Sequence, residues 1–176
     1  MNPDVVIRPV ADADIASIHA IYTREVLEGV ATYEYDVPDA AEMRRRVRAI
    51  VDLRYPYLVA ESGGTVLGYA YASGFRARAG YRWTVENTVY VAARARGRGI
   101  GRTLLDALII ECTALGFRQM VAVIGDATNA ASIALHRYAG FVEAGRFPGI
   151  GYKHGRWLEN VQMIRPLGAG CDRPPG

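Results

Sequence analysis

The sequence predicts an α/β protein in which one mixed sheet carries helices on both of its faces. An early pair of strand-like runs is joined by Gly63-Gly64, which is typical of an antiparallel hairpin. Later, a strand, a helix and a strand between Thr84 and Ile124 form a β-α-β unit, which favours parallel neighbours. The 176 residues suit one domain, expected over residues 1–167, with 168–176 as a flexible tail.

Apolar spacing and turn residues divide the first half of the chain into a strand, two helices and a hairpin. The expected elements are a strand at Val5–Arg8, a helix from Asp12 or Asp14 to Gly29, a loop over 30–38, a helix from Asp39 that ends before Pro56, and strands at Tyr57–Glu61 and Val66–Tyr71.

The second half completes the order β-α-α-β-β-β-α-β-α-β-β. Its expected elements are a polar loop over Gly74–Arg82, a strand at Thr84–Val91, an amphipathic helix from Ile100 that Gly116 ends, a strand at Met120–Ile124, a helix from near Asn129 to Ala139, and strands at Phe141–Phe147 and Trp157–Arg165.

Composition excludes several classes of protein. With 51% hydrophobic and 22% charged residues the chain is not disordered, and no apolar run reaches the ~18 residues of a membrane helix. Met1–Asp4 does not begin a secretory signal, and Cys112 and Cys171 make no disulfide framework, so we expect a cytoplasmic protein. A net charge of +3 does not predict a nucleic-acid partner.

The segment Arg96-Gly-Arg-Gly-Ile-Gly-Arg102 predicts an anion site. Its glycines let the backbone approach a ligand, and the following helix adds unpaired N–H groups and the positive end of its dipole. The GxGxG spacing differs from the GxGxxG dinucleotide fingerprint, and the segment lacks the lysine of a P-loop. A pyrophosphate or a similar anion is the expected ligand, and the alternative is a glycine-rich turn with surface arginines.

Arg96-x-x-Gly99-x-Gly101 resembles the acyl-CoA pyrophosphate loop of the GNAT acetyltransferase superfamily, and the run from Asn129 to Phe141 resembles its NxxSxxLYxxxGF segment. Four further runs are similar to those of phosphinothricin and methionine sulfoximine acetyltransferases: Arg54–Glu61, Trp83–Val91, Val121–Gly125 and Gly151–Trp157. The resemblance implies the GNAT acyl-CoA acyltransferase fold, acetyl-CoA as cosubstrate without a metal, and a homodimer.

The resemblance also assigns the cosubstrate-binding residues. It implies that strand backbone binds the pantetheine arm and acetyl carbonyl, that the glycine-rich loop binds the pyrophosphate, and that one helix start binds the pantetheine. The implied residues are Val89, Tyr90, Val91, Arg96, Gly97, Arg98, Gly99, Ile100, Gly101, Arg102, Asn129 and Ser132.

Glu86 and His136 are the candidate catalytic residues. An amine is a cation at neutral pH and attacks only after losing a proton, which the Glu86 carboxylate can accept directly or through water. The alternative is a strand charge that faces outward or pairs with a cation. His136 replaces the tyrosine that many GNAT enzymes use to protonate the thiolate, and it is a general acid or a hydrogen-bonding residue near the cosubstrate.

The basic loop from Gly74 to Arg82 is the expected acceptor pocket, because arginines bind carboxylates and phosphinates with forked hydrogen bonds. The resemblance places Lys153 and His154 near a subunit interface, where they would complete a neighbour's pocket. The expected substrate-binding residues are Tyr33, Arg76, Arg78, Tyr81, Thr84, Val85 and Glu86.

These residues predict an enzyme that moves acetyl from acetyl-CoA to the α-amine of a glutamate-analogue amino acid. Because no cysteine is placed as a nucleophile, we expect direct attack in a ternary complex. The alternatives are another acceptor (a protein N-terminus, a polyamine or an aminoglycoside) and a non-catalytic module that binds CoA or nucleic acid. No membrane or nucleic-acid partner is expected.

Overall fold

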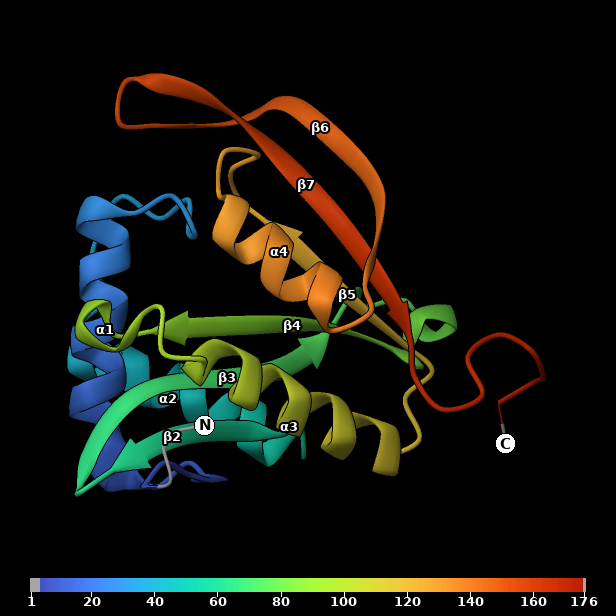
Figure 1. Ribbon diagram of the computed structural model, residues 1–176, viewed down its shortest axis with the longest axis horizontal. Coiled ribbons are helices and arrows are strands. Elements are labelled where there is room, and N and C mark those ends of the chain that lie inside the picture. Colours follow the sequence, from blue (N-terminus) through green and yellow to red (C-terminus); the bar gives the residue numbers. More distant parts are fainter. Residues whose placement is uncertain (1–3, 176) are drawn as a thin grey trace.

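The computed structural model describes residues 4–175, which form one twisted sheet between two pairs of helices (Figure 1). Its seven strands in this range run in the order β1-β2-β3-β4-β5-β7-β6, and only β4 and β5 are parallel. The strands are β1 Val6–Pro9, β2 Tyr57–Ser62, β3 Thr65–Gly74, β4 Thr84–Val91, β5 Gln119–Ile124, β6 Val142–Lys153 and β7 Arg156–Pro166.

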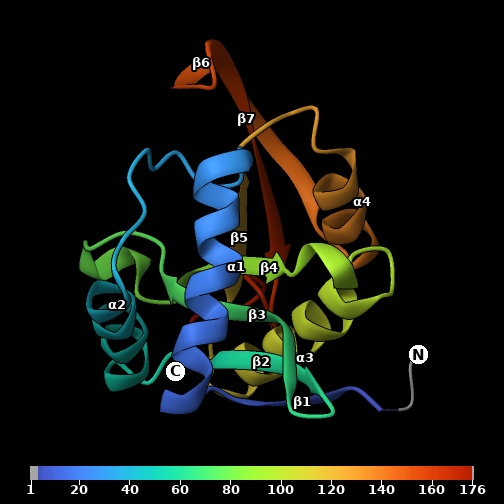
Figure 2. The same ribbon diagram turned by 90° about the vertical axis from the view of Figure 1, so that its left-hand side faces the viewer.

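Two helices cover each face of the sheet. Figure 2 shows α1 and α2 on one side and α3 and α4 on the other. The chain around them includes three short 3₁₀ turns, η1 Asp12–Asp14, η2 Ala79–Tyr81 and η3 Ala93–Ala95. The helices are α1 Ile15–Glu28, α2 Ala40–Asp52, α3 Ile100–Ala114 and α4 Ala130–Tyr138.

Each pair of helices buries its own core against the sheet. Ile18 and Val26 of α1 pack with Val47 of α2 over one face. Leu104 and Leu108 of α3 are fully buried over the other face. This arrangement confirms the predicted mixed sheet with helices on both faces and the predicted order of elements.

Local sequence signals account for several boundaries. The Asp39 side chain accepts a hydrogen bond of 2.7 Å from the Glu42 amide and so caps α2. Gly63 and Gly64 have φ of 55° and 76°, the conformation of a type I′ hairpin turn. Asp14 precedes α1 but does not cap it, because its carboxylate binds Arg8 at 2.7 and 2.8 Å.

β3 and β6 extend several residues beyond the bounds that the sequence predicts. β3 continues to Gly74 because it pairs with β4 as far as Val85. The sequence predicts that β6 ends near Phe147, whereas Pro148 and Gly149 lie within the observed strand. A bulge between Phe147 and Gly151 absorbs these residues, and pairing with β7 then resumes up to Lys153.

The end of the described chain follows β7 as a series of turns. Gly170 is buried, and the Arg118 Nη2 group donates to the carbonyl oxygens of Arg173 and Pro174 at 2.8 and 3.2 Å. Within residues 4–175 no helix has the length and apolar character that a membrane crossing requires.

Candidate active site

The sheet splits between its two parallel strands. β4 pairs with β5 only from Thr84 to Asn87, whereas it stays paired with β3 as far as Val91. Beyond Asn87, the edge of β4 that faces β5 has no partner strand in the described chain. Backbone N–H and C=O groups in such a gap are free to bind a ligand as an added strand would.

A cavity of about 320 Å³ occupies this gap. Its walls come from β4, β5, α4, the start of β7 and the segment after α1. The lining residues are Tyr22, Ala31, Thr32, Tyr33, Tyr71, Glu86, Asn87, Thr88, Val89, Tyr90, Ala122, Val123, Ile124, Gly125, Asn129, Ser132, His136 and Asn160.

Glu86 lines the cavity from the face of the sheet that α1 and α2 cover. Its side chain is half-buried, and no hydrogen bond or ion pair involves its carboxylate within residues 4–175. Burial raises the pKa of Glu86 above its ordinary value, because the charged form loses water. An unpaired carboxylate with a raised pKa is suited to accept a proton.

His136 lines the cavity from the opposite face, on α4. Its Nδ1 donates to the Ser132 carbonyl oxygen at 2.8 Å, and its Nε2 lies 3.0 Å from Asn87 Oδ1. Asn87 is held in place because its Nδ2 donates to the Val121 carbonyl at 3.0 Å. The ring is 4% exposed, and burial lowers the pKa of His136.

Strand alternation explains how these residues surround one cavity. Glu86 and Asn87 are consecutive on β4, so their side chains point to opposite faces of the sheet. Asn87 contacts His136 on the α4 side, while Glu86 faces the segment after α1. The cavity therefore reaches both faces of the sheet, with the candidate base on one face and the candidate acid on the other.

The glycine-rich loop begins α3 with unpaired amides. Gly97 and Gly99 have φ of 72° and 80°, and nothing lies within 4 Å of a Cβ built on either one. Glycine is therefore needed there for backbone conformation rather than for space. The first helical hydrogen bond runs from the Thr103 amide to the Gly99 carbonyl, so the amides of residues 100–102 have no partner within the helix.

The arginines of this loop have different surroundings. The Arg96 guanidinium pairs with Glu25 of α1, and its Nε donates to the Val91 carbonyl at 3.2 Å. Arg102 lies over the Tyr138 ring, 3.7 Å from the ring centre, and Arg98 is exposed. Val91 and Arg96 line a second cavity of about 260 Å³ beside α1.

Asn129 and Ser132 lie at the start of α4, at the edge of the main cavity. The Asn129 Oδ1 accepts a hydrogen bond of 3.0 Å from the Ser132 amide and caps the helix. Ser132 Oγ is 3.5 Å from His136 Nδ1. Tyr138, two positions after His136, points elsewhere and is 64% exposed, as the helical period predicts.

Residues 29–35, called the wall segment below, close the cavity on the side of α1. Tyr33 donates its hydroxyl to the Gly125 carbonyl at 2.5 Å and packs beside Gly125, where a Cβ would clash with the Val30 carbonyl oxygen. Burial raises the pKa of Tyr33. Tyr33, which the sequence predicts to bind the substrate, therefore lines the same cavity as Glu86.

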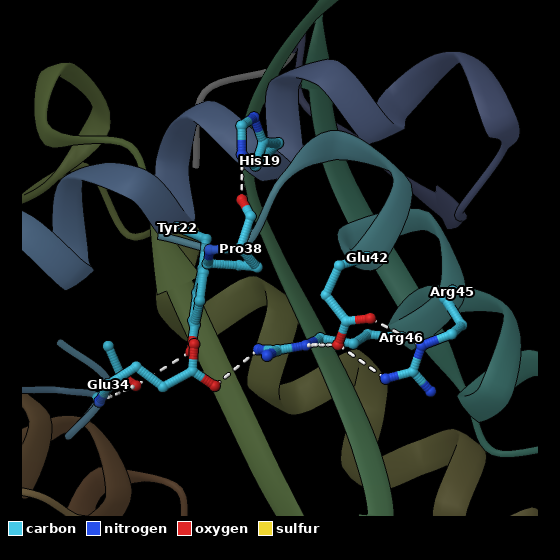
Figure 3. A network of polar contacts seen from close by, with 8 residues as sticks. His19, Tyr22, Glu34, Pro38, Glu42, Arg45 and Arg46 are labelled. Carbon is cyan, nitrogen blue, oxygen red and sulfur yellow. Dashed lines mark hydrogen bonds and ion pairs between the residues drawn. The ribbon is translucent and has the colours of Figure 1, made fainter. Parts of the chain in front are cut away.

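A polar network ties the wall segment to α1 and α2 (Figure 3). The Tyr22 hydroxyl and Thr32 Oγ1 are 3.0 Å apart, and Glu34 accepts from Arg46 at 2.7 Å. Arg46 also donates to Glu42 at 2.7 Å. His19, on α1, donates to the Pro38 carbonyl at 2.7 Å and has a structural contact rather than a place in the cavity.

Five of the expected acceptor-binding residues do not line the main cavity. Arg76 stacks its guanidinium on the rings of Phe75 and Tyr81, and Arg78 is exposed on the same loop. Thr84 lies at the paired start of β4. Val85 is fully buried in the core against α3, because alternation turns it away from Glu86. The five residues outside the cavity lining are Arg76, Arg78, Tyr81, Thr84 and Val85.

Lys153 faces inward in this structure, whereas His154 is exposed. Lys153 is 2% exposed and donates to the Thr32 carbonyl at 2.8 Å, so its ammonium is enclosed by its own chain. His154 donates to the Gly29 carbonyl at 3.1 Å. The Lys153 donors are thus turned toward the wall segment of the same chain, and a contribution of this region to a neighbour's pocket stays a prediction.

Several cavity residues were not predicted from the sequence. Asn87 is the most informative, since it fixes His136, and a buried polar residue in a run of β formers was the signal available. Asn160 and Thr32 come from segments that carry no motif, and only the folded chain brings them to the gap.

Comparisons with known proteins agree with this geometry. Residues 7–161 match the family model of the acetyltransferase (GNAT) domain. A phosphinothricin N-acetyltransferase from Alcaligenes faecalis is 48% identical over 93% of this chain and 83% of that protein. An L-methionine sulfoximine/L-methionine sulfone acetyltransferase from Pseudomonas paraeruginosa is 43% identical over 89% of this chain and 91% of that protein.

Among solved structures, a GNAT superfamily phosphinothricin acetyltransferase from Sinorhizobium meliloti in complex with AcCoA superposes with a TM-score of 0.95. It is 50% identical, and the match covers 98% of this chain and 94% of that one. The chain belongs to the GNAT acetyltransferases, in the branch that contains the phosphinothricin and methionine sulfoximine acetyltransferases.

Proposed function

We propose that the protein transfers acetyl from acetyl-CoA to the α-amine of an amino acid of the phosphinothricin or methionine sulfoximine type. The observation that carries this proposal is the split between β4 and β5, with Glu86 on one side of it and His136 on the other. The relatives named above act on such amino acids, and they cover most of this chain.

The residues present fit acetyl-CoA. The unpaired amides that begin α3 suit a pyrophosphate, and the open edge of β4 over residues 88–91 suits the amides of a pantetheine arm. Val89, Tyr90, Asn129 and Ser132 line the gap between them. When bound there, acetyl-CoA supplies the activated acyl group.

The residues of this chain then move the proton. Glu86 removes it from the acceptor ammonium, and its raised pKa brings it closer to that of the amine it must deprotonate. Backbone N–H groups of β4 in the gap polarise the acyl carbonyl. His136 is the proposed acid that returns a proton to the departing sulfur, and its contacts with Ser132 and Asn87 fix the orientation of its ring.

No cysteine of this chain supports a covalent intermediate. Cys112 lies on the buried face of α3, and burial raises the pKa of its thiol to about 12. Cys171 is exposed near the end of the described chain and does not line the cavity. Direct attack in a ternary complex is therefore the proposed route.

Recognition of the acceptor combines the wall segment with the basic loop. Tyr33 and Thr32 line the cavity next to Glu86. Arg76, Arg78 and Tyr81 remain proposed contacts for the carboxylate or the phosphinate, since Arg76 stacks on Tyr81 in the loop just before β4. A basic loop disfavours polyamines and aminoglycosides, which are cations.

A competitive panel of amines tests the proposed function. Free thiol released from acetyl-CoA is measured with phosphinothricin, methionine sulfoximine, methionine sulfone, a polyamine, an aminoglycoside and a peptide with a free N-terminus. We expect kcat/KM to be highest for one of the first three. Turnover confined to the polyamine, the aminoglycoside or the peptide contradicts the proposal, and acetyl-CoA binding without turnover of any amine supports a non-catalytic module.

We also infer that two copies of the chain associate through the end of the β6–β7 hairpin. Large apolar side chains are exposed there and on the adjoining wall segment, and contiguous exposed apolar surface marks interaction sites. This hairpin patch consists of Tyr35, Phe147, Ile150, Tyr152 and Trp157.

A further inference from the structure

The end of the β6–β7 hairpin, residues 151–155, is hydrogen-bonded to the wall segment. Lys153 Nζ donates to the carbonyl oxygens of Thr32 at 2.8 Å and of Glu25 at 3.4 Å. Next to it, His154 donates to the Gly29 carbonyl, and the Tyr35 hydroxyl donates to the Tyr152 carbonyl. The hairpin end reaches over the segment that follows α1 (Figure 1).

Lys153 is an unusual group to enclose. It is the only lysine of the chain, it is 2% exposed, and no carboxylate pairs with it within residues 4–175. Its partners are carbonyl oxygens, one of them in the last turn of α1, where the helix dipole favours a cation. Burial lowers the pKa of Lys153. A buried ammonium is costly to hold, so its contacts have a defined geometry.

The residues that the hairpin end contacts also line the cavity. Thr32, whose carbonyl Lys153 binds, lines the cavity together with Tyr33. Gly151 of the hairpin lies against the Tyr33 ring so closely that a Cβ at this position would clash with it. The hairpin therefore fixes both the backbone and the aromatic ring that face Glu86.

The wall segment has a second anchor on its other side. The Tyr22–Thr32 and Glu34–Arg46 contacts tie it to α1 and α2 (Figure 3). Those contacts bind side chains of the segment, whereas Lys153 binds its main chain at the cavity. Loss of Lys153 is thus expected to loosen the wall without releasing the segment from the helices.

We propose that Lys153 is a positioning residue that holds the wall segment in the shape that orients the acceptor amine beside Glu86. This inference rests on the proposed function, because the acceptor is the ligand that the wall contacts. Lys153 contacts the wall segment and not the start of α3, so we expect acetyl-CoA binding at α3 to be independent of Lys153.

The test compares Lys153→Met with Lys153→Arg and with Arg146→Met. Lys153→Met removes the donors and the charge, and we expect KM for the acceptor to rise about tenfold while KM for acetyl-CoA stays constant. Lys153→Arg restores a cation and recovers part of the loss. Arg146→Met is the matched control, because Arg146 is an exposed cation on the same hairpin that pairs with Glu143.

Tyr35→Phe gives the second variant if Lys153→Met does not fold. It removes one hydroxyl from a side chain that is 66% exposed, and we expect a smaller rise in the same KM. An unchanged acceptor KM in a folded Lys153→Met enzyme overturns the inference, as does an equal rise in both KM values.

A labelling experiment separates this inference from the proposed function. An amine-reactive ester labels Lys153 in the native protein and in denaturant, and mass spectrometry gives both rates. We expect labelling at least about tenfold slower in the native state and faster in Tyr35→Phe than in the parent. The labelling rate does not depend on turnover. The absence of thiol release with every amine would contradict only the proposed function, and rapid labelling of Lys153 in the native state would contradict only its enclosure.

Discussion

At the scale of single residues, the site depends on where neighbours in the sequence point. Glu86 and Asn87 are adjacent, yet Glu86 faces the wall segment and Asn87 contacts His136. Each of the two candidate catalytic groups is desolvated, and burial raises the pKa of Glu86 and lowers that of His136. The shift brings the pKa of Glu86 closer to neutral pH, which suits a base, whereas it moves the pKa of His136 further below neutral pH and favours the uncharged ring.

Replacing Glu86 by Gln tests the proposed base. We expect kcat to fall by ~10²–10⁴, because the amide keeps the shape but accepts no proton. In the parent, activity is lost as the pH falls through the raised pKa of Glu86, since the protonated carboxyl is no longer a base. Steady-state rates against pH measure this, and the acid limb should be absent in Glu86→Gln.

Glu111→Gln is the control for Glu86→Gln, because Glu111 is exposed on α3 and lies outside the cavity. Its rate and pH profile should match those of the parent. Turnover in Glu86→Gln within a few-fold of the parent, with acceptor binding retained, would remove Glu86 from the mechanism.

At the scale of elements, the two ends of α3 allow an effect on ligand binding to be distinguished from an effect on stability. Its start has unpaired amides behind Gly99, and its end is closed by Gly116. Both glycines have positive φ, of 80° and 86°, and both have open space where a Cβ would lie. They differ in what surrounds them, since only Gly99 borders the proposed pyrophosphate site.

Gly99→Ala and Gly116→Ala form a matched pair of variants. Both should lower the free energy of unfolding by about 1–2 kcal/mol, because L residues rarely adopt positive φ. Only Gly99→Ala should weaken acetyl-CoA binding, since a shift of the loop misplaces the amides of residues 100–102. Thermal unfolding and calorimetric titration measure the two effects. Equal affinity in both variants would disconnect this loop from the cosubstrate.

At the scale of the whole molecule, the hairpin patch joins the site to the outer surface. The hairpin end holds the wall segment from within and exposes apolar side chains outward, with Trp157 69% exposed. Association of two copies through this patch would stabilise the same hairpin that contacts the wall of the cavity.

Trp157→Asp tests this association. The parent should elute as a dimer in size-exclusion chromatography with light scattering at micromolar concentration, and Trp157→Asp should shift it to monomer, because a buried unpaired charge is costly. Leu53→Asp, at a position 71% exposed outside the patch, should leave the mass unchanged. A monomeric parent, or a dimer unaffected by Trp157→Asp, would rule out this interface.

The order of the elements and the glycine-rich loop could be predicted because they depend on local signals. Alternating apolar residues, the Asp39 cap and Gly63-Gly64 act within a few residues, and the structure places each element in its predicted order. The family could be predicted from motifs such as Arg96 to Gly101, because their residue types and spacing can be read from the sequence alone.

Only the tertiary structure placed the wall of the cavity. Thr32, Asn87, Lys153 and Asn160 come from four separate segments, and no periodicity links them. The direction of Lys153 is decided by carbonyl groups more than a hundred residues earlier in the chain, and the extent of β6 by pairing across a bulge. Motif spacing thus determined the reaction class, while long-range packing decided which side chains line the cavity, because a contact between distant segments exists only after the chain has folded.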